Sequence, residues 1–126
     1  MTVIRDADAR RSETAGGIMT TFASPSQGGA SRSLWRVDVK PGVAGPSHDF
    51  DSEQVWTWLA GAATVELGGE TFGVGPGDTV VMPARTVRRV TAGAETGYTA
   101  VVTAPAGARA LAADGTDAYG TPPWIA

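Results

Sequence analysis

His48 is the residue of this sequence best suited to chemistry near neutral pH, because it is the only histidine in the chain. An imidazole titrates near pH 7, so it can act as a general acid, a general base or a hydrogen-bond partner of a substrate. The alternative is a structural role in which His48 hydrogen-bonds Asp49 or Gln54. A further option is that a nearby carboxylate (Asp49, Asp51 or Glu53) joins His48 around a metal ion.

Two tryptophans and an amide follow His48 with a spacing of two residues. Gln54, Trp56 and Trp58 fall on one face of a strand, since side chains alternate between the two faces. On the same alternation, Glu53 points to the opposite face. An inward-facing pair of indoles with an amide at one end would suit an aromatic or unsaturated ligand. The alternative is that the tryptophans only fill the core.

Many short strands are expected to position these side chains. Alternating, β-branched and aromatic stretches are bounded by glycine and proline, which is typical of strands and turns. The pattern predicts strands at 18–23, 33–40, 54–60, 63–67, 70–74, 79–82, 87–91 and 98–103. Gly68-Gly69 predicts a two-residue hairpin turn with positive φ. No segment has a sustained helical period, so we expect an all-β sandwich or jelly roll.

Composition narrows the function classes. The 126 residues suit a single domain, and the net charge of −3 makes a nucleic-acid partner improbable. The chain has no cysteine, which excludes disulfides and thiolate chemistry. With no apolar segment long enough for a signal peptide or a membrane span, we expect a cytoplasmic protein that does not bind membranes.

The spacing of several residues resembles the two signatures of the cupin superfamily. Gly42, His48, Phe50, Gln54 and Gly61 fit G-x5-H-x-H-x3-E-x6-G without a gap. The second signature, G-x5-P-x-G-x2-H-x3-N, is matched in spacing by these residues: Gly77, Pro83, Arg85, Arg88 and Ala92. The resemblance implies a cupin-type jelly-roll barrel with its core at 33–104, within one domain at 17–126. Residues 1–16 are then an arm or an edge strand, and 105–126 an irregular tail on which Trp124 and Ile125 dock.

The resemblance implies three histidines and one glutamate around a metal, but only His48 keeps its type. Phe50, Gln54 and Arg88 stand where the other three ligands would be. Phenylalanine has no ligand atom and arginine has no free lone pair. We therefore expect no cofactor, and a divalent metal only if His48 binds it with Gln54 or a nearby carboxylate.

At its position in the signature, Arg88 should point into the barrel, where its charge needs a carboxylate or an anionic ligand. It would then anchor a substrate carboxylate, phosphate or enolate. The alternative is an ion pair with a local acid or a side chain that reaches the rim. Arg89 should face outward, and Arg85, in place of a glycine, should rim the barrel mouth.

These residues favour a metal-independent cupin enzyme that transfers protons, as an isomerase or cyclase does. His48, Arg88 and Gln54 are the expected catalytic residues. The expected substrate-binding residues are Trp56, Trp58, Phe50, Val90 and Met82. The ligand would be a small organic molecule, anionic or aromatic. The alternatives are a metal-dependent oxygenase with unusual ligands and a non-catalytic binding or sensing module. The resemblance also implies a homodimer, for which Val55, Thr57 and Leu59 could supply an exposed face.

Overall fold

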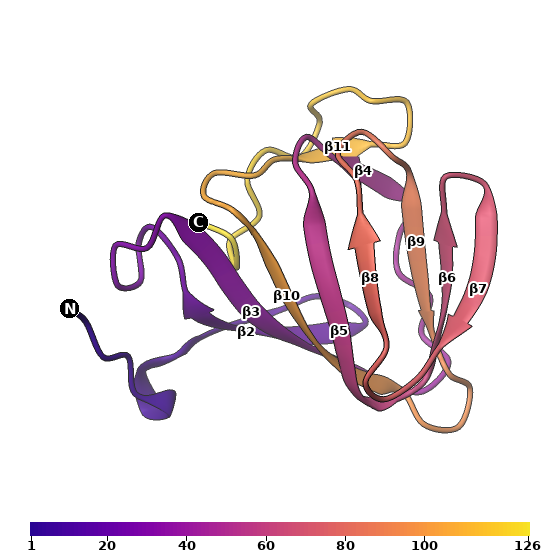
Figure 1. Ribbon diagram of the computed structural model, residues 1–126, viewed down its shortest axis with the longest axis horizontal. Coiled ribbons are helices and arrows are strands. Elements are labelled where there is room, and N and C mark those ends of the chain that lie inside the picture. Colours follow the sequence, from indigo (N-terminus) through magenta and orange to yellow (C-terminus); the bar gives the residue numbers. More distant parts are fainter.

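Two antiparallel β-sheets face each other in the computed structural model, which describes residues 1–126 (Figure 1). One sheet has six strands in the order β1-β2-β3-β10-β5-β8, and the other has five in the order β11-β4-β9-β6-β7. The first sheet contains β1 (Arg10–Glu13), β2 (Gly17–Ala23), β3 (Arg32–Val39), β10 (Tyr98–Pro105), β5 (Gln54–Gly61) and β8 (Thr79–Met82). The second contains β11 (Ala110–Ala112), β4 (His48–Phe50), β9 (Arg88–Ala92), β6 (Ala63–Leu67) and β7 (Glu70–Val74). This is the jelly-roll arrangement that the sequence predicts.

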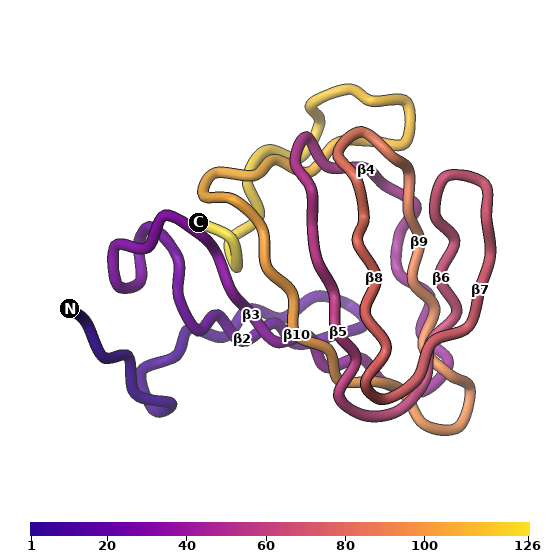
Figure 2. The backbone as a smooth tube through the Cα atoms, viewed as in Figure 1, coloured from indigo at the N-terminus to yellow at the C-terminus, as the bar shows by residue number.

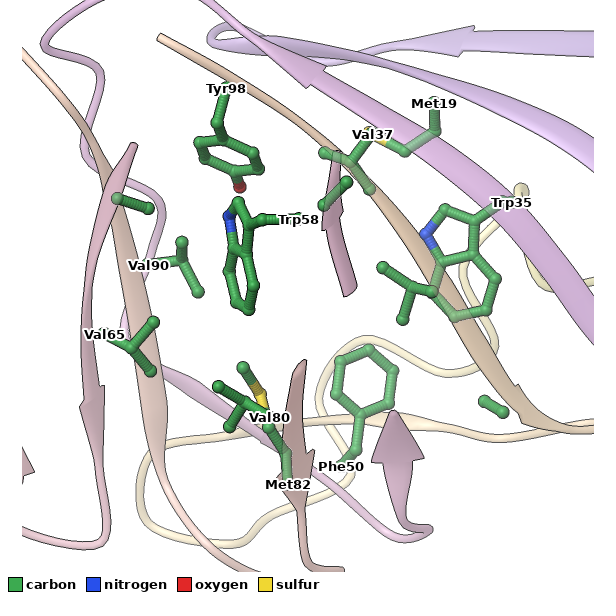
Figure 3. Packing of buried hydrophobic residues seen from close by; sticks show 14 of the residues in the cluster. Met19, Trp35, Val37, Phe50, Trp58, Val65, Val80, Met82, Val90 and Tyr98 are labelled. Carbon is green, nitrogen blue, oxygen red and sulfur yellow. The ribbon is translucent and has the colours of Figure 1, made fainter. Parts of the chain in front are cut away.

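Alternation along the strands builds the core between the two sheets. In β10 every second side chain is buried, beginning at Tyr98. The same period in β3, β6, β8 and β9 turns apolar side chains of both sheets toward a common interior (Figure 3). The largest of these side chains are Trp35, Phe50, Trp58, Met82 and Tyr98.

Gly68 and Gly69 form the turn between β6 and β7 with φ angles of 57° and 86°. Both angles lie in the left-handed region, where glycine is favoured because it has no Cβ. The two-residue turn predicted from the sequence is therefore confirmed.

The C-terminal tail is more ordered than the sequence indicated, and part of the N-terminal segment forms the edge strand that was one of its two expected states. The tail was expected to be irregular, and this is wrong for β11, which pairs with β4. β1 forms one edge of the six-stranded sheet, next to β2. The residues before β1 lie outside the two sheets (Figure 2). Strands this short have too few residues to show a period, so pairing partners decide their conformation.

The C-terminus docks through backbone carbonyls and one apolar side chain. Ile125 is fully buried, and its carbonyl accepts a hydrogen bond from the Ser33 hydroxyl at 2.6 Å. The Thr21 hydroxyl donates to the carbonyl of Trp124 at 2.8 Å. These contacts close the barrel beside β2 and β3. No helix in the structure has the length and apolar character to cross a membrane.

Candidate functional site

Arg88 is the first residue of β9, and its side chain enters the barrel with 1% of its surface exposed. The loop before β9 binds the guanidinium through backbone carbonyls. Nε donates to Thr86 O at 3.1 Å, while Nη2 donates to Thr86 O at 2.9 Å and to Pro83 O at 3.0 Å. Nη1 makes only long contacts, 3.5 Å to Gln54 Oε1 and 3.8 Å to Met82 Sδ. Nη1 is therefore the part of the fork with donor capacity left.

The charge of Arg88 is balanced by one carboxylate and one aromatic ring. Asp49 Oδ1 lies 3.7 Å from Nη2, and the ring of Phe50 lies 5.5 Å from the guanidinium carbon. Burial lowers the pKa of Arg88 and the charge of Asp49 raises it. A local acid thus takes part, as one of the alternatives from the sequence anticipated, but loop carbonyls supply most of the hydrogen bonds.

His48 lies opposite Arg88 in the pairing of β4 with β9, so both side chains are on the same side of the sheet. Its Nδ1 lies 2.9 Å from the carbonyl oxygen of Pro46. A carbonyl can only accept, so Nδ1 carries the proton and Nε2 keeps a free lone pair. The alternative in which His48 hydrogen-bonds Asp49 or Gln54 is wrong. Asp49 Oδ1 instead accepts from the backbone N–H of Phe50 at 2.7 Å.

Two effects favour the neutral form of the imidazole. Burial lowers the pKa of His48 from its usual value of 6.5, and the nearby charge of Arg88 lowers it further. The hydrogen bond to Pro46 and the charge of Asp49 act in the opposite direction and are outweighed. The Phe50 ring packs edge-on against the imidazole, with ring centroids 5.3 Å apart. His48 is thus a neutral base beside a fixed positive charge.

Gln54, Trp56 and Trp58 share the inner face of β5. Trp56 and Trp58 stack with ring centroids 5.4 Å apart, and the indole N–H of Trp56 donates to Gln54 Oε1 at 3.0 Å. The indole N–H of Trp58 is fully buried and has no hydrogen-bond partner. Tyr98, which no motif indicated, completes this cluster with its ring centroid 6.1 Å from that of Trp58.

The larger apolar cavity, of about 420 Å³, opens beside this cluster rather than at Arg88. Its volume is in the range of small-molecule sites. The side chains that enclose it come from both sheets and from the segment before β4: Met19, Val39, Val43, Pro46, Val90 and Tyr98. Of the expected site residues only Val90 lines it. Arg88 lies opposite His48 in the strand pairing and reaches Gln54, and none of these three residues lines the cavity. Phe50 and Met82 are core side chains.

Alternation along β10 was the signal that could have identified Tyr98. It begins β10 in phase with buried Ala100 and Val102, so its ring must face inward. Met19 and Val43 had no such signal, because the cavity depends on how the turn between β1 and β2 meets the segment before β4.

A family model for the cupin domain matches residues 35–103, which is more than half of the chain. The chain belongs to the cupin family. No curated protein matches this cupin by sequence. Among solved structures it is similar to the polyketide cyclase RemF from Streptomyces resistomycificus, with 20% identity, a TM-score of 0.76 and coverage of 89% of this chain and 84% of that one.

Two further structures have the same fold. KdgF from Halomonas sp. has 20% identity and a TM-score of 0.69, with coverage of 83% of this cupin and 94% of that chain. A mutant of Bacillus subtilis oxalate decarboxylase has 18% identity and a TM-score of 0.74, and the match covers 86% of this chain but 31% of the enzyme. At identities this low the comparisons show a shared fold only. The chemistry has to be inferred from the residues of this chain.

The residues of this cupin do not fit the metal ion that its family signatures imply. No group of three or more His, Cys, Asp or Glu side chains is arranged to hold a metal. At the expected position, Arg88 Nη1 points at Gln54 Oε1, and the Phe50 ring lies beside the guanidinium. A buried guanidinium repels a divalent cation, and a single imidazole with one neutral amide is a weak ligand set.

Proposed function

We propose that this cupin is a small-molecule enzyme that transfers protons without a metal ion, as an isomerase or cyclase does. The observation that carries the proposal is the state of His48. Its Nδ1 is tied to Pro46 O, and burial keeps the ring neutral, so Nε2 is a base at neutral pH. General bases of this kind contribute about 10²- to 10⁴-fold to a rate.

The reaction we propose is removal of a proton from a carbon next to a carbonyl group. Nε2 of His48 takes the proton, the electron pair of the C–H bond forms a carbon–carbon double bond, and the π pair of the carbonyl moves onto its oxygen to give an enolate. The fixed charge of Arg88, with Nη1 under-used, stabilises that negative charge. The imidazolium then returns the proton to another atom of the ligand, which completes an isomerisation or accompanies ring closure.

The fold comparison adds modest support. RemF is described as a polyketide cyclase, and the chemistry of such a reaction needs enolates of the kind that a neutral base and a guanidinium handle.

A non-catalytic binding module is the second candidate, and one observation favours it. The apolar cavity is lined by neither His48 nor Arg88, so a ligand could bind there without meeting the base. The two candidates differ in whether a bound ketone exchanges its protons.

Deuterium exchange at the carbon next to the carbonyl tests the proposal. The protein is incubated in D2O with α-tetralone, a cyclic ketone, and exchange is followed by NMR. We expect faster exchange than in buffer, and a loss of about 10²-fold in His48→Gln. Glu53→Gln, at an exposed residue nearby, is the matched control and should keep the activity. Full exchange in His48→Gln would exclude His48 as the base, and binding without exchange would favour the binding module.

A further inference from the structure

The turn between β1 and β2, at residues 14–17, separates two cavities. It lines the apolar cavity of about 420 Å³ described above, and it also lines a second cavity of about 370 Å³. Glu13, Asp38 and Lys40 line the second cavity, whereas no charged residue lines the first. Glu13 and Lys40 are exposed, so the second cavity is open to solvent. The charged cavity is termed the outer cavity and the apolar one the inner cavity.

The innermost side chains of the inner cavity are almost sealed from water. Met19, Val90 and Tyr98 line it from β2, β9 and β10, and their exposed fractions are only 6%, 9% and 7%. All three extend into the barrel interior (Figure 3). A molecule that reaches them has to cross the rim of the cavity, which the β1–β2 turn forms together with the segment at residues 43–46.

The two sides of this rim are attached to the barrel in different ways. Backbone hydrogen bonds of 2.9 and 2.8 Å join Gly45 and Val43 to β9, so segment 43–46 is fixed to the five-stranded sheet. The β1–β2 turn is held only through the two strands that it connects, and β1 is an edge strand. A hydrogen bond of 2.9 Å from Thr14 N to Gly17 O closes the turn on itself. No hydrogen bond joins the turn to segment 43–46, so the turn is the side of the rim that can move.

The turn meets segment 43–46 through Gly16 and Val43. A Cβ added at Gly16 would collide with Cγ1 of Val43 and would lie 3.6 Å from its Cβ, so the backbone of Gly16 rests directly on this side chain. The φ of Gly16 is not in the left-handed region. The backbone therefore does not require a glycine here, whereas the close contact with Val43 does. One apolar contact without a hydrogen bond is weak, so the two residues separate at little cost in free energy.

We infer that the β1–β2 turn is a gate for the inner cavity, which opens when Gly16 separates from Val43 and admits a small uncharged molecule from the outer cavity. Segment 43–46 stays on β9 while the turn moves. An ion is excluded, because the inner cavity has no charged group to replace its hydration. The gate concerns access to the cavity and goes beyond the proposed function, so it stands or fails independently of proton transfer by His48.

Oxidation of Met19 by hydrogen peroxide measures this opening without any ligand. Peroxide is a small uncharged molecule that converts methionine to its sulfoxide, and mass spectrometry of peptides gives the rate at each methionine. Met19 lines the inner cavity, so its rate follows the fraction of molecules in which the gate is open. Met82 is the control within the same chain, since it is 0% exposed and lines neither cavity. Its rate follows unfolding of the whole barrel.

A disulfide across the rim should keep the gate closed. In Gly16→Cys/Val43→Cys the two Cβ atoms would lie 3.6 Å apart, within the range of about 3.5–4.5 Å that a disulfide requires. The natural chain has no cysteine, so only this pair can form. The disulfide form should oxidise at Met19 about tenfold more slowly than the wild type, with Met82 unchanged. Equal rates at Met19, or failure of the disulfide to form, would overturn the gate.

Two alanine substitutions should each open the gate and should compensate when they are combined. Val43→Ala removes the closing contact, and Gly16→Ala collides with Val43, so each should raise the rate at Met19 about three- to tenfold. In the double variant the new methyl group lies 3.6 Å from the Cβ at position 43, an ordinary contact, so the rate should return close to that of the wild type.

Val81→Ala is the matched control for these substitutions, because Val81 is 53% exposed and lines neither cavity. It should leave the rate at Met19 unchanged. A double variant as fast as the single variants would contradict the contact between Gly16 and Val43. A rise at Met82 as large as that at Met19 would show global unfolding in place of a gate.

A charged oxidant tests which molecules the gate admits. Peroxymonosulfate also oxidises methionine but is an anion. When each rate at Met19 is divided by the rate for free methionine, peroxide should be favoured over peroxymonosulfate by about tenfold, because the anion would lose its hydration in the inner cavity. Equal ratios for the two oxidants would overturn the restriction to uncharged molecules.

Discussion

Arg88 is a fixed cation in the interior of a barrel whose family signature has a histidine at that position. Three hydrogen bonds to the carbonyls of Pro83 and Thr86, a carboxylate at 3.7 Å and an aromatic ring compensate for the lost hydration. The same guanidinium disfavours protonation of His48. Arg88 therefore has three roles. It organises the loop before β9 through hydrogen bonds, makes the site unsuitable for a metal ion and lowers the pKa of His48.

Removing the charge of Arg88 should be strongly destabilising. In Arg88→Met, Asp49 remains as a buried charge and the loop carbonyls lose their donors, so we expect a loss of about 3–5 kcal/mol in the free energy of unfolding. Arg88→Lys keeps the charge without the planar fork and should lose less. Urea denaturation measures both. The double variant Arg88→Met/Asp49→Asn should recover part of the loss, and failure to recover any would mean that Asp49 does not balance this charge.

The stability of the protein should fall on mild acidification because of His48. Its pKa is lowered in the folded state, so between that lowered value and 6.5 the unfolded chain binds a proton that the folded protein does not. Stability then rises with pH across this window and is lost as pH falls through it. Urea denaturation at several pH values should show the slope in the wild type and not in His48→Gln. An unchanged slope would contradict the lowered pKa, since His48 is the only histidine.

The sequence could predict which side chains enter the barrel, but it could not predict their hydrogen-bond partners. Signature spacing and alternation placed Gln54 and Arg88 on inner faces, and both are buried. The carbonyls of Pro83 and Thr86 that bind Arg88 carry no side-chain signal, because every residue has a carbonyl. The hydrogen-bond partner of His48, the carbonyl of Pro46, could not be predicted for the same reason.

At the scale of elements, the loop between β8 and β9 has one unusual backbone conformation. Arg85 has a φ of 54°, in the left-handed region, at the position where the cupin signature has a glycine. Its N–H donates to the carbonyl of Phe50 at 2.8 Å, which joins this loop to the end of β4. The expectation that Arg85 lies at the edge of the barrel agrees with its exposed side chain.

Relieving that conformation should stabilise the loop. Arg85→Gly should raise the free energy of unfolding by about 0.5 kcal/mol, the strain removed being partly offset by the flexibility of glycine in the unfolded chain. Arg85→Val should lower it by about 1 kcal/mol, since a β-branched residue tolerates positive φ poorly. Arg89→Gly is the contrast, because Arg89 is an exposed residue within β9, where glycine should destabilise. Urea denaturation of the three variants measures the signs, and a loss in Arg85→Gly would show that the arginine side chain itself stabilises the loop.

The eight strands of the central part of the chain were predictable, including the four-residue β8, and β1, β4 and β11 were not. β4 and β11 have three residues each; β11 pairs with β4, and β4 pairs also with β9. Long-range pairing of this kind leaves no local period in the sequence. The cavity depends on such contacts between distant segments, so its position could not be predicted either.

For the whole molecule, the outer face of the six-stranded sheet carries a row of three apolar side chains and one threonine. Val81, Val55, Thr103 and Leu34 are neighbours in register across β8, β5, β10 and β3. Val81 is 53% exposed, and Leu59 on the same face is 54% exposed. Apolar side chains in a contiguous patch of this kind are typical of an interface between proteins.

The homodimer expected from the sequence should therefore form through this face. Two copies related by a two-fold axis would place the row of one against the row of the other, which buries the apolar side chains of both. Light scattering after size-exclusion chromatography should give the mass of a dimer. Val81→Lys should shift it toward the monomer, because the charge would be buried at the interface without a partner. Val87→Lys is the matched control, since Val87 is exposed in the loop before β9 and outside the six-stranded sheet. A monomeric wild type, or a Val81→Lys variant that remains dimeric, would show that this row is not the interface.

Since the cavity and His48 lie on the inner side of the barrel, the monomeric variant should still bind α-tetralone, and that result would separate assembly from ligand binding.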